Sequence, residues 1–426
     1  MSGTLTTGKL ILTNTQSNQD AFDRLRVSNP FTLFEITHQI GKTPIIVDEI
    51  VSGAGATSNY ISDNSYIQMG VTGAPGATGK VIRQTYEYIP YQPGKSKLMY
   101  FSGVLEALQG GVADSISRIG CFDSTIEKTS VVGPGNGCFF ELNGTTLNAV
   151  IRLNDVDTKV AQSVWNYDKF DGTGPSGLTI NDFSKCLILG IDQEWLGVGQ
   201  VRFGFFVNGS FHLGHSFNHF GVNAIVYPYT RTAKLPLRFE ISSTSSTQSE
   251  MRMICGSVIS EGGFEPIGSS FSIGSIAGKV VGNTLVPIMS LKLKSNEPLN
   301  RKTLVLKNMI ILNPSDSKGT QWDLYILPSE NNLTGHSFQD ANATNSSALY
   351  DISSTAVSLT GATLIESGYM DLSQTVGYNF TKYLSAPLVN CGIDGTSRIL
   401  CLAGVRITTG GTDPTVNASM SWFEIN

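Results

Sequence analysis

The chain is poor in charged residues. Asp, Glu, Lys and Arg make up 15% of its 426 residues, well below the roughly 25% that is usual in soluble globular proteins. Hydrophobic residues account for 40%, and Gly alone numbers 45. This composition excludes a disordered chain, which would combine high net charge with few apolar residues. It is typical of a sheet protein with many turns. A surface covered by neighbouring subunits would explain the low charge, and so would a secreted β-protein with a neutral surface.

Basic runs and long apolar runs are also missing. The net charge is −5, so we expect no attraction to nucleic acid or to an anionic membrane surface. The longest apolar stretches, such as Cys186–Ile191, are far shorter than the ~20 residues that span a bilayer. The first residues, Met1–Gly8, lack the basic patch and apolar stretch of a secretion signal. These features predict a chain made in a cytoplasm.

The six cysteines are scattered singly along the chain. No two form a CxxC pair, so their spacing gives little support to zinc or redox chemistry. An even number would permit disulfides, but apolar neighbours and a cytoplasmic start favour buried free thiols. We expect no cofactor. The cysteines are Cys121, Cys138, Cys186, Cys255, Cys391 and Cys401.

Short extended runs separated by turn residues recur from residue 31 to about residue 262. The clearest pair is Val201–Val207 and Ser210–Phe217, with Asn208-Gly209 between them. Asn-Gly between two β-rich runs is the strongest short-range signal for a hairpin. Helical periodicity is scarce, and Val104–Leu108 is the best short candidate. Many short strands without intervening helices predict antiparallel sheets packed as a sandwich or jelly roll.

The strand pattern restarts after a Gly-rich segment, Glu261–Gly268. We therefore predict an all-β protein with an extended N-terminal arm (residues 1–30) and two antiparallel β-sandwich, jelly-roll-like domains. The first domain covers residues 31–262 and the smaller second one residues 263–426. The arm ends in an apolar hook, which favours docking on the body or on a neighbouring subunit over a frayed terminus. The hook residues expected to take part in assembly are Phe22, Arg24, Leu25, Arg26 and Val27.

Three histidines, His212, His215 and His219, lie within eight residues and suggest a metal site. They belong to an expected strand, however, where residues three apart point to opposite faces. Only a bend would bring all three side chains together, so the spacing favours no metal site.

The segment Trp165–Gly177 contains two carboxylates in a Gly-rich run, as calcium-binding or sugar-binding loops can. It has no EF-hand spacing and few carboxylates for a hard cation. A structured surface loop, in which Asp and Gly supply the turn geometry, is the simpler interpretation. The candidate ligand-binding residues of this loop are Trp165, Asp168 and Asp171.

A β-sandwich can also carry a pair of carboxylates for glycoside cleavage on one of its faces. Four carboxylates on expected strands are candidates, but no spacing distinguishes any two of them: Glu141, Asp192, Glu194 and Glu240. We therefore predict no catalytic residue and no enzyme.

Several long stretches resemble a family of virion proteins from tailed bacteriophages. The resemblance spans most of the chain, with two departures: Asp23 stands where the family is expected to have Gly, and the histidine region differs. The stretches that carry it are Gln19–Phe34, Pro90–Ser96, Trp165–Gly177, Asp192–Gly204 and the closing Ser419–Trp422.

The resemblance implies a structural, tail-associated or fibre-like protein with no catalytic residues to transfer. We expect a structural component of the virion, in the tail or baseplate, in a fibre or decorating the head. Its partners would be copies of itself, as a homo-oligomer, and other virion proteins, with no nucleic acid or membrane. The first alternative is a receptor- or glycan-binding module of the virion, whose partner is a host-surface glycan. The second is a tailspike enzyme that degrades glycans.

Overall fold

The structure is a computed structural model of the whole chain. It describes residues 3–6 and 9–12 and, between residues 29 and 425, all residues except 54, 75–76, 109–110, 126, 128–132, 222–223, 266–267, 297–300, 315–317, 381–387 and 408–409. The chain divides into two compact units. Unit 1 comprises residues 1–85, 89–125 and 134–265, and unit 2 comprises residues 86–88, 126–133 and 266–426.

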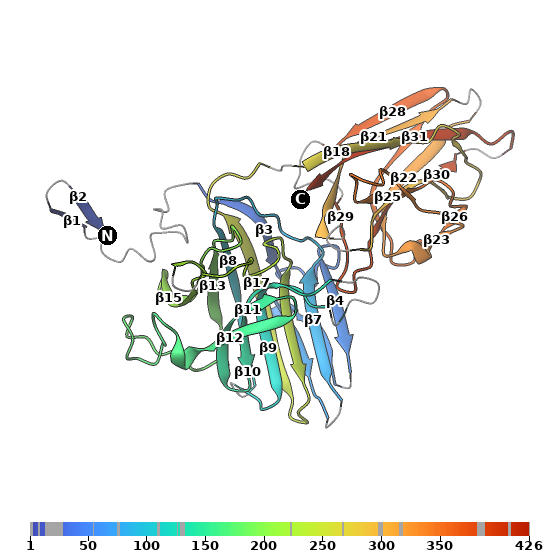
Figure 1. Cartoon of the computed structure of the whole chain (residues 1–426). Coiled ribbons are helices and arrows are strands. Elements are labelled where there is room, and N and C mark those ends of the chain that lie inside the picture. The colour runs from blue at the N-terminus through green and yellow to red at the C-terminus, as the bar shows by residue number, and fades with distance from the viewer. Residues whose placement is uncertain are drawn as a thin grey trace. The chain divides into compact units, whose positions relative to one another are not determined.

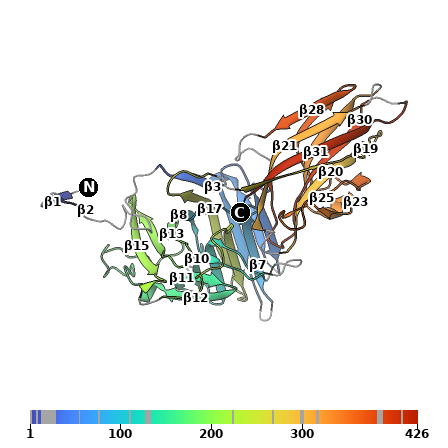
Figure 2. The same ribbon diagram turned by 45° about the horizontal axis from the view of Figure 1, so that its top comes forward.

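Strands dominate both units, and every strand pairing in the described residues is antiparallel (Figures 1 and 2). The described residues contain no α-helix, only short 3₁₀ turns such as η2 (Gln162–Val164). The all-β antiparallel fold expected from the composition and the turn pattern is therefore confirmed. No helix in the described part of the chain has the length and apolar character needed to cross a membrane.

Unit 1 contains a seven-stranded sheet with the strand order β12-β11-β10-β9-β16-β7-β4. Along its central strands the residues alternate between a face that enters the main hydrophobic core, such as Ile119 and Phe140, and a face that carries Arg118 and Glu141. The strands are β4 (Val47–Ser52), β7 (Gly79–Thr85), β9 (Ser115–Phe122), β10 (Gly137–Asn143), β11 (Thr146–Leu153), β12 (Val156–Ala161) and β16 (Leu237–Ser243).

The second large sheet of unit 1 has the order β15-β14-β13-β8-β17-β6-β5, with β3 also paired to β17. It packs face to face on the first sheet, because Phe140 and Phe203 meet edge to face at 5.1 Å and Phe101 meets Phe239 at 6.2 Å. Unit 1 is thus a β-sandwich. The strands are β3 (Phe31–Thr37), β5 (Thr57–Ile61), β6 (Tyr66–Val71), β8 (Lys97–Val104), β13 (Leu187–Gln193), β14 (Val201–Val207), β15 (Ser210–Phe217) and β17 (Ser249–Ser260).

The hairpin expected at Asn208-Gly209 is present between β14 and β15. Asn208 and Gly209 have φ angles of 51° and 78°, the left-handed conformation that a type I′ turn needs at both positions. The register of the two strands shifts once, between Phe203 and Gly204. This bulge places His215 opposite Phe203 and Leu213 opposite Gly204, so it interrupts the simple alternation of β15.

The prediction of a short helix at Val104–Leu108 is wrong. Val104 is the last residue of β8, and the chain then continues without a helix. The amide of Glu106 donates to the carbonyl of Phe183, and the amide of Ala107 donates to the carbonyl of Glu250. These tertiary hydrogen bonds replace the local ones of a helix, which a five-residue run is too short to stabilise alone.

Unit 2 also contains two packed sheets, with the orders β18-β31-β21-β28 and β24-β25-β20-β30-β22-β27. Trp322 of the second sheet meets Tyr378 of the first edge to face at 5.2 Å, so the two sheets enclose a core of their own. The main strands are β18 (Gly268–Gly274), β20 (Val286–Leu293), β21 (Thr303–Asn313), β22 (Thr320–Leu327), β24 (Gln339–Asp340), β25 (Ala348–Asp351), β27 (Thr363–Met370), β28 (Gln374–Asn379), β30 (Ile399–Arg406) and β31 (Thr415–Ile425). Shorter pieces join them: β19 (Lys279–Val280), β23 (Leu333–Thr334), β26 (Ala356–Val357) and β29 (Leu388–Val389).

None of the six cysteines, all of which lie in the described residues, forms a disulfide, as their apolar neighbours suggested. Cys121, Cys138, Cys391 and Cys401 are buried, whereas Cys186 is exposed and Cys255 is half-buried. The expectation of burial is therefore wrong for Cys186, because this residue lies in the loop before β13 and not on the strand itself.

Near the N-terminus, β1 (Gly3–Thr6) and β2 (Lys9–Leu12) form a two-stranded antiparallel hairpin. The hook expected to take part in assembly (Phe22, Arg24, Leu25, Arg26 and Val27) lies outside the described residues. Its role stays a prediction.

Candidate functional site

The loop between β12 and β13 is organised by the carboxylate of Asp168. Its Oδ1 accepts a hydrogen bond from the amide of Phe170, and its Oδ2 accepts one from the amide of Ser176, each at 2.8 Å. Asp168 is only 4% exposed. Gly174 lies so close that a Cβ at this position would be 2.1 Å from Asp168 Oδ1. Asp168 therefore ties together two distant parts of the loop, a structural role that its burial makes hard to combine with ligand binding.

The Trp165 side chain is likewise part of the hydrophobic core and not of the surface. Its ring is 3% exposed and lies about 6 Å from the rings of Phe140, Phe170 and Phe205. The indole Nε1 donates to the carbonyl of Val160 at 3.0 Å. This hydrogen bond gives the buried indole N–H a partner that it would otherwise lack. An aromatic ring in this position has no open face for a sugar to stack on.

Asp171 is the one residue of the three candidates that is exposed. Its Oδ1 accepts from the side chain of Thr173 at 2.6 Å and from its amide at 2.9 Å. These hydrogen bonds lower the pKa of the Asp171 carboxyl below its ordinary value, so the group is ionised at neutral pH. Asp171 borders a hollow of about 370 Å³, which we call the Asp171 hollow. Its rim includes Thr146, Ser163, Lys169, Asp171, Thr179 and Asn181.

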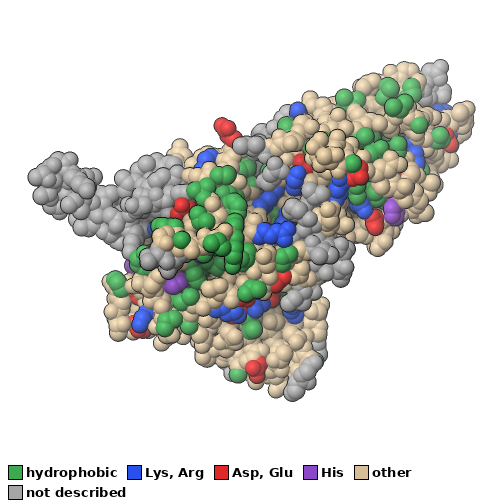
Figure 3. Space-filling view, viewed as in Figure 1, with side chains coloured by type: hydrophobic (Ala, Val, Ile, Leu, Met, Phe, Trp, Pro, Cys, Tyr) green, Lys and Arg blue, Asp and Glu red, His purple; other side chains and the backbone are tan. Residues whose placement is uncertain are grey.

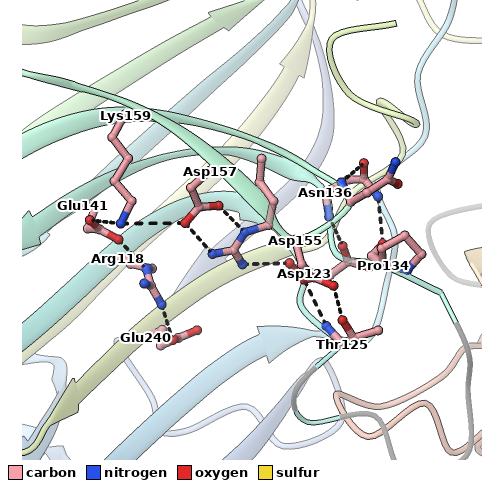
Figure 4. Close-up of polar contacts among 12 residues, drawn as sticks. Arg118, Asp123, Thr125, Pro134, Asn136, Glu141, Asp155, Asp157, Lys159 and Glu240 are labelled. Carbon is pink, nitrogen blue, oxygen red and sulfur yellow. Dashed lines mark hydrogen bonds and ion pairs between the residues drawn. The ribbon is translucent and has the colours of Figure 1, made fainter. Parts of the chain in front are cut away.

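Two of the four candidate carboxylates lie together on the face of the seven-stranded sheet that is turned away from the core. Strand register places Glu141 opposite Arg118, and Arg118 opposite Glu240. Arg118 Nε donates to Glu141 at 2.9 Å, and Arg118 Nη1 donates to Glu240 at 2.8 Å. Figure 4 shows this row, which continues through Lys159, whose Nζ is 2.6 Å from Glu141. We call these residues, with Arg238, the ion ladder.

The ion ladder holds the Glu240 carboxylate in its charged form. Burial opposes the charge of Glu240, but Arg238 and Arg118 outweigh it and lower the pKa of Glu240 to about 2. A glycosidase acid needs the opposite, a raised pKa, with room for the scissile bond between the two carboxylates. Here the Arg118 guanidinium occupies that space. The arrangement fits cross-strand stabilisation of the sheet and not acid catalysis.

The other two candidate carboxylates lie on, and directly after, β13 of the other sheet of unit 1. Asp192 on β13 is fully buried and forms an ion pair with Arg202, its neighbour across the β13–β14 pairing. Glu194 lies in the turn that follows β13, where its carboxylate accepts from the amide of Gln200 at 3.3 Å. The expectation of a strand position is therefore wrong for Glu194. The structure places Glu141 and Glu240 on one sheet, Asp192 on the other and Glu194 in a turn.

The rings of two of the three histidines, His215 and His219, both contact the ring of Phe217, at 4.6 and 6.5 Å. His215 is buried, and burial lowers its pKa to about 4. His219 Nδ1 lies 2.7 Å from the carbonyl of Gly199, and its ring stacks on Tyr229 at 4.2 Å. His212 is half-buried on β15. Across the described ranges, no cluster of three or more His, Cys, Asp or Glu side chains has metal-binding geometry.

A surface that sequence reasoning missed is formed by the β13–β14 turn and the segment after β15. Five large apolar side chains are exposed there, and Figure 3 shows hydrophobic side chains gathered on one face of unit 1. We call this surface the apolar platform. Its members and their exposed fractions are Leu196 (49%), Val198 (43%), Phe220 (57%), Val226 (93%) and Tyr227 (62%). No sequence period marks these residues, because they lie on two loops.

Hydrogen bonds clamp the two loops of the apolar platform together. The amide of Tyr229 donates to the carbonyl of Gly197 at 2.9 Å, and its hydroxyl donates to the carbonyl of Glu194 at 2.9 Å. Trp195 Nε1 donates to the carbonyl of Thr230 at 3.0 Å. These hydrogen bonds hold the β13–β14 turn against Tyr229 and Thr230, close in sequence to the exposed side chains of the platform.

No protein-family model matches the chain, and no curated protein matches it. Among solved structures, peanut lectin with a nine-residue peptide is 12% identical over 55% of this chain and 98% of that chain, with a TM-score of 0.32. Endo-β-1,4-glucuronan lyase from the fungus Trichoderma reesei is 13% identical over 53% and 94%, with a TM-score of 0.32. Endo-1,3-β-glucanase from Streptomyces sioyaensis is 7% identical over 55% and 98%, with a TM-score of 0.34. At such low TM-scores these likenesses carry no argument about what the chain does.

Proposed function

We propose that the chain is a structural component of a tailed-bacteriophage particle, joined to copies of itself and to other virion proteins through protein contacts. The long stretches that resemble virion proteins support this proposal. The observation that carries it is the apolar platform, because rigid exposed apolar surface is a mark of protein interaction sites.

The platform has the chemistry of an interface core. Its five members are aliphatic or aromatic, and none is charged. Interface cores are depleted in charge and enriched in aromatic residues. Burying a large apolar side chain contributes about 1.5–3 kcal/mol. Hydrogen bonds from Tyr229 to Gly197 and Glu194 hold the two loops together, which limits the conformational entropy that is lost when a partner binds.

The ion ladder also supports a structural role, because it stabilises the seven-stranded sheet of unit 1. It links β12, β10, β9 and β16 through alternating charges, in addition to the backbone hydrogen bonds of the sheet. A building block that must present one fixed surface to its neighbours benefits from a sheet that does not deform.

The test is a phage carrying the double substitution Val226→Ser and Tyr227→Ser in this chain. Each lost apolar contact of about 1.5 kcal/mol or more weakens association at least tenfold. We therefore expect the variant to fold normally but to fall at least tenfold in purified particles, as measured by quantitative mass spectrometry.

The matched control is Val156→Ser, which removes a 70% exposed apolar side chain from β12, outside the platform. This variant should enter particles at the normal level. Normal incorporation of the double variant would remove the platform from the proposal, and absence of the unaltered chain from purified particles would overturn the proposal altogether.

A further inference from the structure

The Asp171 hollow combines an apolar floor with a polar rim. Leu147, Phe170 and Phe183 line it and are almost fully buried, so they form the floor. The exposed rim residues supply hydroxyl, amide, ammonium and carboxylate groups. A volume of about 370 Å³ lies within the range of small-molecule sites. An apolar base with a few polar groups around it is the usual composition of such sites.

The loop that carries Asp171 is preorganised. Asp171 pairs with Thr179 in an isolated antiparallel bridge, and the amide of Gly172 donates to the carbonyl of Leu178 at 3.0 Å. Gln162 Nε2 donates to the carbonyls of Lys169 and Ile180 at 2.9 and 2.8 Å, which joins two segments that border the hollow. A ligand would therefore meet side chains that are already in place, at a low entropic cost.

The backbone of the floor is strained. Phe170 has a φ angle of 53°, which is unusual for a bulky residue. The Asp168 carboxylate and the hydrogen bond from the amide of Ile180 to the carbonyl of Phe170, at 2.8 Å, hold it there. Strain of this kind is retained where the surrounding structure demands it, and it clusters at functional sites.

We infer that the Asp171 hollow binds a neutral saccharide. Sugar hydroxyls both donate and accept hydrogen bonds, and the rim offers both kinds of partner: Asp171 accepts, Lys169 donates, and Asn181 does either. One cation and one anion leave the rim without net charge, which favours an uncharged ligand over an acidic one. This inference is independent of the assembly role, because the hollow and the apolar platform share no residue.

The experiment is saturation-transfer difference NMR on the purified full chain with glucose, galactose, mannose and N-acetylglucosamine, each tested singly. Asp171→Asn keeps an oxygen that can accept from Thr173 but removes the charge. The matched control is Asp182→Asn, because Asp182 makes the same pair of hydrogen bonds, to the amide and hydroxyl of Ser184, without bordering the hollow.

We expect at least one sugar to receive saturation. Asp171→Asn should weaken its binding about tenfold or more, since a hydrogen bond to a charged group is lost, and Asp182→Asn should leave it unchanged. Absence of signal from all four sugars would overturn the inference, as would equal loss in the two variants or a signal that Asp171→Asn leaves intact. Displacement of the sugar by a Ser-Gly-Ser-Gly peptide would also overturn it, because the hollow would then be a peptide site.

Discussion

Replacing Asp168 by Ala separates the structural and ligand-binding interpretations of the loop between β12 and β13. The substitution removes the acceptors of two backbone amides, those of Phe170 and Ser176, each at 2.8 Å from the carboxylate. At 4% exposure, the site admits little water to replace these acceptors. The same change at Asp171, three positions along the chain, removes an exposed carboxylate that bonds only locally to Thr173.

The expected losses differ several-fold. A hydrogen bond to a charged group contributes about 1.5–3 kcal/mol, and a buried amide left without an acceptor carries a comparable penalty. Two such bonds give about 3–6 kcal/mol for Asp168→Ala. This corresponds to a fall of roughly 6–24 °C in the melting temperature, at 2–4 °C per kcal/mol for a domain of this size. Asp171→Ala should change the free energy of unfolding by less than about 0.5 kcal/mol, as is usual for exposed positions.

Urea unfolding followed by tryptophan fluorescence measures both changes, because Trp165 packs against Phe170 and reports on this region. Hydrogen exchange of the peptide 165–177 gives a local reading and should show fast exchange of the Phe170 and Ser176 amides only in Asp168→Ala. Equal stability of the two variants would refute the reasoning, since it would mean that the buried carboxylate contributes no more than the exposed one.

Three further predictions concern the charges and the arm. The pKa of Glu240 is lowered to about 2, so the stabilisation it contributes is complete above pH 4.5 and is lost as the pH falls from 4.5 toward 2. The pKa of His215 is lowered to about 4, so the unfolded chain binds its proton first, and stability falls between pH 6.5 and 4. Burial also lowers the pKa of His38 to about 4, so His38 contributes to the same upper step. Thermal melts from pH 7 to 2 should show both steps, and His215→Gln should reduce the upper one without abolishing it. Arg118→Met leaves two buried carboxylates short of a partner and should lower the free energy of unfolding by about 3 kcal/mol. Lys159→Met, at a side chain that is 35% exposed, should cost less than about 1 kcal/mol; similar losses in chemical denaturation would contradict this ranking. Deletion of residues 1–27 should leave a folded body that does not enter the particle, and normal incorporation on a protein gel of purified phage would refute the role of the arm.

Local rules were sufficient wherever a short segment has only one good conformation. Asn208-Gly209 predicted its hairpin because two successive left-handed residues suit few other dipeptides. The lack of helical period predicted the all-β class. The Gly- and Asp-rich composition of Trp165–Gly177 indicated a structured loop, and the hydrogen bonds of Asp168 are those of such a loop.

Tertiary structure decided which side of each element faces water and which distant residues meet. Trp165 and Asp168 looked available for a ligand, but packing buries both and leaves Asp171 at the hollow. Glu141 and Glu240 are distant in sequence and become neighbours of one guanidinium only through the pairing of β9 with β10 and β16. The apolar platform has no sequence signature, since its two loops are joined by hydrogen bonds between backbone groups that every residue carries.

Sequence by itself therefore determined the class of fold and its tightest turns, because these depend on local conformation. The sites depend on long-range register and burial, which only the folded chain specifies.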